Sequence, residues 1–409
     1  MEVKELKKVF STVYGQELQH VFFAPGRVNL IGEHTDYNGG FVFPCALSFG
    51  TFLLLAPNTE KKIRFCSLNV LKRSDCGGEK DVVVEKKCCD KTLYVTEIAL
   101  ADVCTPLAQN IWVNYPLGSI AQFVKRGIEV GCGYDLLFWG DVPAGAGLSS
   151  SAAIEVVTAF AMNEMLGAGF DRTEIAKIGQ LSEHEFAGVN CGIMDQFASA
   201  QGKKDYAIYL NCDSLDFTLV PVKLDGVKVV ISNTHSPHKL DSGAYNARVA
   251  QCKQAVADIC AVRPIKNLAE LSMSDFEEVK GAIKDEVARR RAHHVVSEVK
   301  RTKDAVEALQ QGNITLFGEL MNASHVSLRD DYEVTGKELD TLAEAAWSVD
   351  GVIGSRMTGG GFGGCTVSLV KEEAIPTFIE TVGKIYTETT GLKADFYIAQ
   401  IGDGAHRVD

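Results

Sequence analysis

A glycine-rich segment that leads directly into a helical one is the most restrictive feature of this sequence. Residues 141–153 read Asp-Val-Pro-Ala-Gly-Ala-Gly-Leu-Ser-Ser-Ser-Ala-Ala, and from Ala152 onward apolar residues recur at three- and four-residue spacing. Free backbone N–H groups and the positive end of the helix dipole face the same way there, and glycines let a phosphate approach closely. A helix N-cap needs one serine and this segment has three. The segment therefore predicts a phosphate site, although it is neither a Walker loop nor a Rossmann fingerprint.

A phosphate site that serves phosphoryl transfer also predicts Mg²⁺, which prefers oxygen ligands. Ser151 offers a hydroxyl at the end of the loop, and a second ligand should be a carboxylate. The helix expected over 173–187 carries Glu183 and Glu185 on either side of His184. Sequence chemistry alone does not choose between the two carboxylates.

A second cluster of polar residues lies between apolar strands in the segment 25–40. It contains Arg27, Asn29, Glu33, His34 and Asp36. A buried turn rarely collects so many charges without a ligand, because each must be paired or solvated. Carboxylates accept hydrogen bonds from hydroxyl groups, so the cluster predicts a hydroxyl-rich ligand. An exposed polar hairpin is the alternative.

A third segment, 358–365, has five glycines in six positions and runs straight into an apolar stretch. Such a loop needs unusual dihedral angles or a close contact between its backbone and another group. A flexible linker would be more polar. The residue chemistry does not specify what this loop contacts.

The length of 409 residues predicts two domains. Strands and helices are plentiful but grouped, which favours an α+β fold over strict βαβ alternation. A polar, turn-rich stretch at 203–226 predicts a boundary between domains 1–205 and 206–409.

The first 70 residues predict short apolar strands. The uncharged run 37–59 contains glycines and prolines, so it favours two buried strands, 41–47 and 51–56, with a turn at 48–50, over a membrane span. Further strands are expected over 207–210, 217–222, 227–231, 365–370 and 396–401, and helices over 152–165, 173–187, from Asp241 onward and through about Ser348.

Composition and charge exclude several functions. A net charge of −12 argues against a dedicated nucleic-acid binder. The basic run 289–291 is followed by Lys300, Arg301 and Lys303, and acidic residues flank and interrupt this set, so a solvated helix face is favoured over a phosphate-binding patch. The N-terminus has no apolar signal segment, so the twelve cysteines are expected as thiols in a cytoplasm. None forms a Cys-x-x-Cys pair, which argues against zinc.

Taken together, the three segments resemble the signature motifs of the GHMP kinase superfamily. The string Gly-Arg-Val-Asn-Leu-Ile-Gly-Glu-His-Thr-Asp-Tyr-Asn-Gly-Gly at 26–40 closely resembles the signature of its galactokinase family. The resemblance runs from residue 25 to residue 365, in the right order. It implies a two-lobed fold with a mixed sheet-and-helix N-terminal domain, an α+β C-terminal domain and an active site between them. It also implies transfer of the γ-phosphate of ATP to the C1 hydroxyl of galactose.

The same resemblance implies roles for individual residues. Asp195 would be the catalytic aspartate and Arg27 its partner. Ser151 and Glu183 would hold Mg²⁺. The sugar would be bound by Glu33, His34, Thr35, Asp36, Gly192 and Tyr245. ATP would be bound by Ser67, Trp112, Tyr115, Gly145, Ala146, Gly147, Leu148, Ser149, Ser150 and Ser151.

Two alternatives stay open at this stage. One is a kinase for a related substrate such as N-acetylgalactosamine or a non-sugar alcohol. The other is a galactose sensor without turnover, which would be expected to lose the phosphate loop or the aspartate. The expected partners are galactose and ATP, without nucleic acid or membrane, and the expected state is a monomer, with oligomers not excluded.

Overall fold

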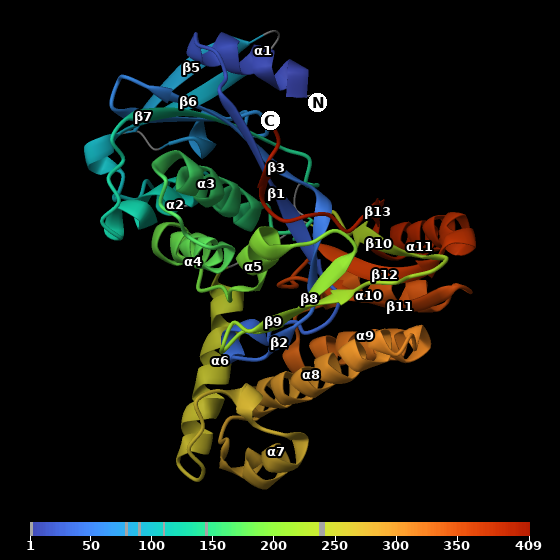
Figure 1. Cartoon of the computed structure of the whole chain (residues 1–409). Coiled ribbons are helices and arrows are strands. Elements are labelled where there is room, and N and C mark those ends of the chain that lie inside the picture. Colours follow the sequence, from blue (N-terminus) through green and yellow to red (C-terminus); the bar gives the residue numbers. More distant parts are fainter. Residues whose placement is uncertain (1–2, 78–80, 89–90, 109–110, 144–145, 237–241) are drawn as a thin grey trace.

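The computed structural model describes residues 3–77, 81–88, 91–108, 111–143, 146–236 and 242–409. An N-terminal lobe of sheet and helices and a C-terminal α+β lobe are both visible in Figure 1. Strands and helices are grouped along the chain, so the α+β class predicted from the sequence is confirmed.

The N-terminal lobe is built on a sheet of seven strands within the described residues. Their order is β14 (His406–Arg407), β1 (His20–Asn29), β3 (Pro44–Asn58), β7 (Gly133–Gly140), β4 (Lys62–Ser67), β6 (Lys91–Ala99) and β5 (Val82–Cys88). Neighbouring strands are antiparallel except for β4 and β7. A smaller sheet contains β2 (Phe41–Val42), β8 (Tyr206–Asn211) and β9 (Phe217–Pro221).

The central strand β3 is buried on both faces. Leu53 and Leu55 lie in the core beneath helices α2 (Asn114–Lys125), α3 (Ser150–Leu166), α4 (Arg172–Ser182) and α5 (Met194–Gln201), which cover one face of the sheet (Figure 1). Leu54 and Ala56 pack on the other face, under α1 (Val3–Tyr14). Successive side chains of a strand point to opposite faces, so a strand covered on both sides needs apolar residues throughout. This explains the uncharged run in the sequence.

Two expectations for the first 70 residues are wrong. The predicted turn at 48–50 does not form, because β3 runs without interruption from Pro44 to Asn58. Gly50 allows β1 and β3 to approach closely there, since an added Cβ would overlap with the backbone of Ala24. The chain also begins with a helix rather than strands: Leu6, Phe10 and Val13 give α1 one buried face at helical spacing.

The C-terminal lobe has a four-stranded sheet, described in the order β11 (Val352–Thr358), β12 (Cys365–Lys371), β10 (Val227–Asn233) and β13 (Asp395–Ala399). Its helices are α6 (Ser242–Cys260), α7 (Met273–Val279), α8 (Glu286–Gln310), α9 (Ile314–Ser327), α10 (Gly336–Trp347) and α11 (Ile375–Thr390). The predicted start of the long helix, Asp241, lies outside the described residues. The strands expected over 227–231 and 365–370 are confirmed.

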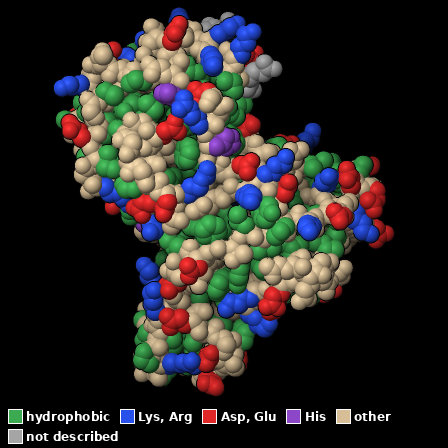
Figure 2. Space-filling view, in the orientation of Figure 1, with side chains coloured by type: hydrophobic (Ala, Val, Ile, Leu, Met, Phe, Trp, Pro, Cys, Tyr) green, Lys and Arg blue, Asp and Glu red, His purple; other side chains and the backbone are tan. Residues whose placement is uncertain are grey.

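The basic run on α8 is not uniformly solvated, so that expectation is wrong for Arg291. Its side chain is 2% exposed and pairs with Glu333 at 2.5 Å, whereas Arg290 reaches the same carboxylate from a more exposed position. On the face of the molecule that Figure 2 shows, cationic and anionic side chains are interspersed rather than gathered into one basic patch.

The two halves of the chain are joined by more than one crossing. Strand β14 pairs with β1, and Leu47 of β3 forms a bridge with Ile401. The boundary between 1–205 and 206–409 remains a prediction. Among the helices of the described ranges, none combines the length and apolar character that a bilayer crossing requires.

The close packing of α9 on β11 gives a test of this architecture. An added Cβ on Gly318 would overlap with the backbone of Ile353, so Gly318→Ala must push the helix off the strand. We expect a loss of about 1–3 kcal/mol in the free energy of unfolding, measured by denaturant titration. Gly281→Ala is the matched control, because nothing lies within 4 Å of its added Cβ. Equal stability of the two variants would contradict this packing.

Candidate active site

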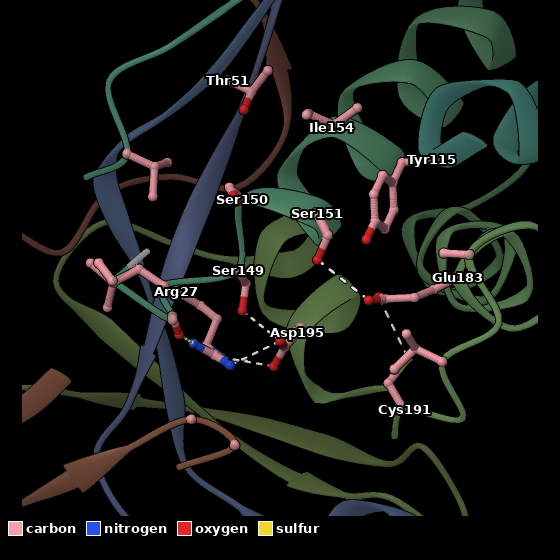
Figure 3. A pocket seen from close by; sticks show the side chains of 18 of the residues that line it. Arg27, Thr51, Tyr115, Ser149, Ser150, Ser151, Ile154, Glu183, Cys191 and Asp195 are labelled. Carbon is pink, nitrogen blue, oxygen red and sulfur yellow. Dashed lines mark hydrogen bonds and ion pairs between the residues drawn. The ribbon is translucent and has the colours of Figure 1, made fainter. Parts of the chain in front are cut away.

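A cavity of about 600 Å³ brings the three sequence segments together. Its walls come from β1, the turn after it, the loop before α3, the start of α5, helix α6 and the glycine loop after β11. The predicted site residues that line it are Arg27, Glu33, His34, Asp36, Ser67, Trp112, Tyr115, Ala146, Gly147, Leu148, Ser149, Ser150, Ser151, Glu183, Gly192, Asp195 and Tyr245. Figure 3 shows ten of the lining residues by name.

Of the remaining predicted site residues, Gly145 lies outside the described residues, and Thr35 does not line the cavity. Thr35 is fully buried behind the turn, and its hydroxyl lies 2.9 Å from the carbonyl oxygen of Gly32 and 2.8 Å from that of Phe41. The Thr35 side chain therefore stabilises the backbone of the turn between Gly32 and Phe41 instead of facing the cavity.

An ion pair in the cavity joins Arg27 of β1 to Asp195 of α5. Two parallel bonds of 2.8 Å join the guanidinium to the carboxylate, as the dashed lines in Figure 3 show. A third bond of 2.8 Å runs from Arg27 to the carbonyl oxygen of Gly147. The arginine side chain is 4% exposed and the aspartate 28%. The carboxylate is thus fixed from behind while remaining open to the cavity.

The phosphate loop contacts the same carboxylate. The hydroxyl of Ser149 donates to Asp195 Oδ2 at 2.5 Å, from a left-handed backbone with φ of 61°. The Ser149 side chain makes no capping bond to α3, so the simple N-cap interpretation is wrong for this residue. The N–H groups at the start of α3 therefore remain available to an anion.

Glu33 links the first and third segments. Its Oε2 accepts from Asn29 Nδ2 at 2.6 Å, and its Oε1 accepts from the backbone N–H of Gly359 at 2.7 Å and from Arg356 at 3.3 Å. The backbone of the glycine-rich loop 358–365 therefore contacts the buried carboxylate of Glu33, which lies in the polar turn that follows β1. Arg356 carried no signal in the sequence because it lies on a strand among core residues.

A second buried carboxylate, Glu298 of α8, holds the turn from below. Its Oε1 accepts from the N–H groups of Gly32 at 3.0 Å and Glu33 at 3.4 Å. Burial raises the pKa of Glu298, but the positive charges of Arg301 and Arg356 outweigh it and lower the pKa to about 2. Glu298 is therefore an ionised anchor that the C-terminal lobe supplies to the turn.

Asp36 lies at the end of this turn, against Gly192. An added Cβ on Gly192 would overlap with the Asp36 carboxylate, so only glycine permits this contact. Burial, and next the nearby charge of Asp195, raise the pKa of Asp36 to about 7. The two carboxylates share one end of the cavity together with Tyr245.

Of the two candidate carboxylates on the predicted helix 173–187, the structure brings Glu183 to the cavity. Glu183 begins the π-helical turn Glu183–Ala187 and lies 3.4 Å from Ser151 Oγ. Glu185 points to the surface and pairs with Lys125 at 2.5 Å. Ser151 at the end of the phosphate loop and Glu183 at the start of the π-helical turn thus face each other.

The chemistry of this pair fits a hard cation. Burial, and next the charge of Asp195, raise the pKa of Glu183 to about 7, so the site lacks positive charge. Across the described ranges, no group of three or more His, Cys, Asp and Glu side chains is arranged so that it could hold a metal ion by itself. A cation bound here would depend on few protein ligands, which suits Mg²⁺ because Mg²⁺ keeps waters and binds substrate phosphates.

The opposite end of the cavity is mostly apolar. The Trp112 ring lies 5.5 Å from Phe138 in an edge-on arrangement, and Ser67 and Tyr115 complete this wall. Sequence reasoning missed several lining residues because they look like ordinary core or strand positions: Thr51, Asn69, Ile111, Phe138, Ile154, Cys191 and Met194.

Comparison with known proteins decides the family. The galactose-binding signature of galactokinases matches residues 8–57, and the N- and C-terminal domains of GHMP kinases match residues 114–203 and 305–386. The galactokinase of Clostridium beijerinckii is 45% identical over 406 residues, 99% of each chain. This chain belongs to the galactokinase family. The galactokinase of Bacillus subtilis is 44% identical over 99% of each chain.

Solved structures agree with this membership of the galactokinase family. The crystal structure of Lactococcus lactis galactokinase complexed with galactose superposes with a TM-score of 0.92 at 41% identity, over 99% of this chain and 100% of that one. Methanococcus jannaschii mevalonate kinase, at 18% identity, has a TM-score of 0.64 over 94% of this chain and 99% of that one, which shows the shared GHMP kinase fold. The two-lobed GHMP fold expected from the motifs is confirmed.

The pKa of Asp36 gives a stability test for ligand-free protein. The unfolded chain loses this proton near pH 3.8, whereas the folded protein keeps it to about pH 7. Asp36 therefore contributes stability at low pH that is lost as the pH rises through this window. Asp36→Asn has no such proton to lose. We therefore expect its melting temperature minus that of the original protein to be several degrees higher at pH 8 than at pH 5.

Thermal melts of both proteins at pH 5 and pH 8 measure the difference between their melting temperatures. Groups that titrate in the same way in both proteins do not contribute to this difference. Glu319→Gln is the control, since it removes a carboxylate from the exposed face of α9. A difference that does not change with pH would contradict the burial of an ionisable Asp36.

Proposed function

We propose that this chain is an ATP-dependent galactokinase that transfers the γ-phosphate of ATP to the C1 hydroxyl of galactose, giving galactose 1-phosphate and ADP. The observation that carries the proposal is the meeting of all three segments at one cavity. The polar turn after β1, the glycine- and serine-rich loop before α3 and an aspartate bound by arginine share its walls. The curated relatives named galactokinase match along the whole chain.

The sugar is proposed to bind at the end of the cavity formed by Asp36, Gly192 and Tyr245, with Glu33 and His34 behind it. Each oxygen of a carboxylate has two lone pairs, so Glu33 retains acceptor capacity beyond its contacts within the protein. Tyr245 offers an aromatic face and a hydroxyl. This end is polar and adjoins Asp195, so a sugar there would present one hydroxyl to that carboxylate.

The triphosphate is proposed to lie along residues 146–151, against the start of α3, with the base toward Ser67, Trp112 and Tyr115. Free N–H groups and the helix dipole favour the phosphates. Ser151 and Glu183 would hold Mg²⁺, which when bound neutralises charge on the phosphate oxygens. The raised pKa of Glu183 supports this, since a cation restores the charge that the site lacks.

Asp195 is the proposed catalytic residue. As the O1–Pγ bond forms, the bond between Pγ and the β-phosphate oxygen breaks and the O1 proton passes to the Asp195 carboxylate. Arg27 holds that carboxylate in place through its two bonds of 2.8 Å. Phosphoryl transfer has a loose transition state, so alignment and charge neutralisation supply most of the rate.

The alternatives differ in substrate or in turnover. A kinase for N-acetylgalactosamine would need room beside the C2 hydroxyl, and a galactose sensor would bind sugar and nucleotide without reaction. The intact phosphate loop, Glu183 and the Arg27–Asp195 pair favour turnover. The proposed compartment is the cytoplasm, supported by buried cysteines such as Cys45, Cys66 and Cys365, which are thiols rather than disulfides. A monomer without nucleic-acid or membrane partners is the proposed working state.

A panel of sugars tests the assignment of the substrate. We expect turnover with galactose and ATP, and strong discrimination against glucose, which differs only at C4. A buried acceptor that loses its hydroxyl partner costs about 1–3 kcal/mol, or roughly 5- to 150-fold in kcat/KM per group. Coupled ADP assays with galactose, glucose and N-acetylgalactosamine, with and without Mg²⁺, measure this. Equal efficiency on glucose, or a preference for N-acetylgalactosamine, would overturn the proposal.

Substitution of the catalytic aspartate tests the mechanism. Asp195→Asn keeps the volume and can hydrogen-bond, but it cannot accept the proton or balance Arg27. We expect turnover to fall by about 10²- to 10⁴-fold, while galactose affinity weakens only modestly. Rapid-quench kinetics and calorimetry on one preparation separate these effects. If turnover and ATP affinity fell in parallel, Asp195 would be a structural ion-pair partner instead.

A further inference from the structure

The backbone of the polar turn is strained at His34. Its φ is 62°, in the left-handed region that residues with a Cβ avoid at a cost of about 1–2 kcal/mol. The strained residue lies between Glu33 and Asp36, so its conformation sets the relative positions of the two carboxylates. Such a conformation persists only where surrounding contacts enforce it.

The His34 ring is held by three tyrosines, Tyr37, Tyr245 and Tyr332. Its Nδ1 lies 2.8 Å from the hydroxyl of Tyr37, and its ring lies 4.7 Å from that of Tyr332. Burial lowers the pKa of His34 to about 3, so the ring is neutral. The ring of Tyr245, which lines the cavity, packs against His34 at 5.7 Å and against Tyr37 at 5.5 Å. The group thus extends from the cavity wall into the C-terminal lobe.

Hydroxyl contacts connect this group to Tyr332. The Tyr37 and Tyr332 hydroxyls lie 2.7 Å apart, and Tyr332 OH lies 3.2 Å from the sulfur of Cys252 on α6. Each of the three groups carries one proton, so the row is satisfied only if all donate in the same direction along it. Loss of the Tyr332 hydroxyl would free the Tyr37 hydroxyl to turn away from His34.

Tyr332 itself does not line the cavity, although it packs on His34, which does. It ends the π-helical turn Leu328–Tyr332, is completely buried, and is not among the residues that line the cavity. It belongs to none of the three sequence segments, and its ring also packs on His294 at 4.5 Å. Its ring touches His34 directly, and its hydroxyl reaches His34 through Tyr37.

We propose that Tyr332 is a positioning residue for the sugar: its hydroxyl fixes Tyr37, which holds the His34 ring and thereby the strained backbone between Glu33 and Asp36. The inference rests on the proposed function of the cavity in binding galactose. The C-terminal lobe in this way pre-organises a turn that belongs to the N-terminal lobe. ATP occupies the other end of the cavity and does not depend on this row of hydroxyls.

The test is Tyr332→Phe, which keeps the ring and removes only the hydroxyl. We expect the Kd for galactose to rise about 3- to 10-fold, the worth of one buried hydrogen bond. The KM for ATP and the kcat at saturating galactose should stay within about twofold, since those contacts are untouched. Calorimetry gives the first value and steady-state assays give the others.

Tyr386→Phe is the matched control. Tyr386 is also completely buried, and its hydroxyl donates to the carbonyl oxygen of Thr234 at 2.6 Å, in a core cluster that does not reach the cavity. The Tyr386→Phe substitution should lower the melting temperature while leaving the Kd for galactose unchanged. A merely structural role for the Tyr332 hydroxyl would make the two variants behave alike.

Tyr37→Phe and the double variant complete the experiment. The two hydroxyls act in one row, so the double variant should weaken galactose binding no more than Tyr37→Phe alone. Wild-type galactose affinity in Tyr332→Phe, or equal losses of galactose and ATP affinity, would overturn the inference. If Tyr332→Phe did not fold, unchanged galactose affinity in Tyr37→Phe would overturn it. Failure of the original protein to bind galactose would instead overturn the proposed function.

Discussion

The site depends on one buried ion pair. Arg27 is almost without solvent, so its charge must be met within the protein, and Asp195 meets it with both oxygens. Removal of Asp195 would leave the charge of Arg27 uncompensated in a low-dielectric region, which typically costs about 3–5 kcal/mol. The pair also fixes β1 against α5, and through Gly147 and Ser149 it fixes the phosphate loop to both. The same contact that stabilises the lobe therefore determines where the reactive carboxylate can lie.

The sugar end of the cavity is built differently, from contacts between the lobes. Glu33 accepts hydrogen bonds from Arg356 and Gly359 of the C-terminal half. Glu298 of α8 accepts a hydrogen bond from the backbone of the turn at Gly32. Buried carboxylates are stable in this arrangement because Arg301 and Arg356 supply charge beside them. Neither lobe could form this turn alone. A kinase built in this way couples the geometry of its acceptor site to the packing of its halves.

Sequence reasoning found the parts of the site that are local. Glycines and serines at 145–151, and carboxylates crowded at 33–36, mark themselves because ordinary packing does not need them. It failed where a role depends on contacts between distant residues. Arg356, Glu298 and Tyr332 resemble ordinary strand or helix residues until the fold brings them beneath the turn. Thr35 shows the converse, since a motif residue can serve the turn rather than the ligand. In the fold, Gly50 suggested a turn, although it permits two strands to approach.

The pairing of β14 with β1 has a consequence for synthesis of the chain. Phe22 emerges from the ribosome hundreds of residues before its partner Arg407 is joined to the chain. At typical elongation rates of about 5–20 residues per second, this edge of the sheet stays open for roughly 20–80 seconds. An open edge presents unpaired N–H and C=O groups to any other extended chain. Nascent molecules on one messenger are thus exposed to mispairing until the last short strand covers β1, and chaperones that shield strand edges would act in that interval.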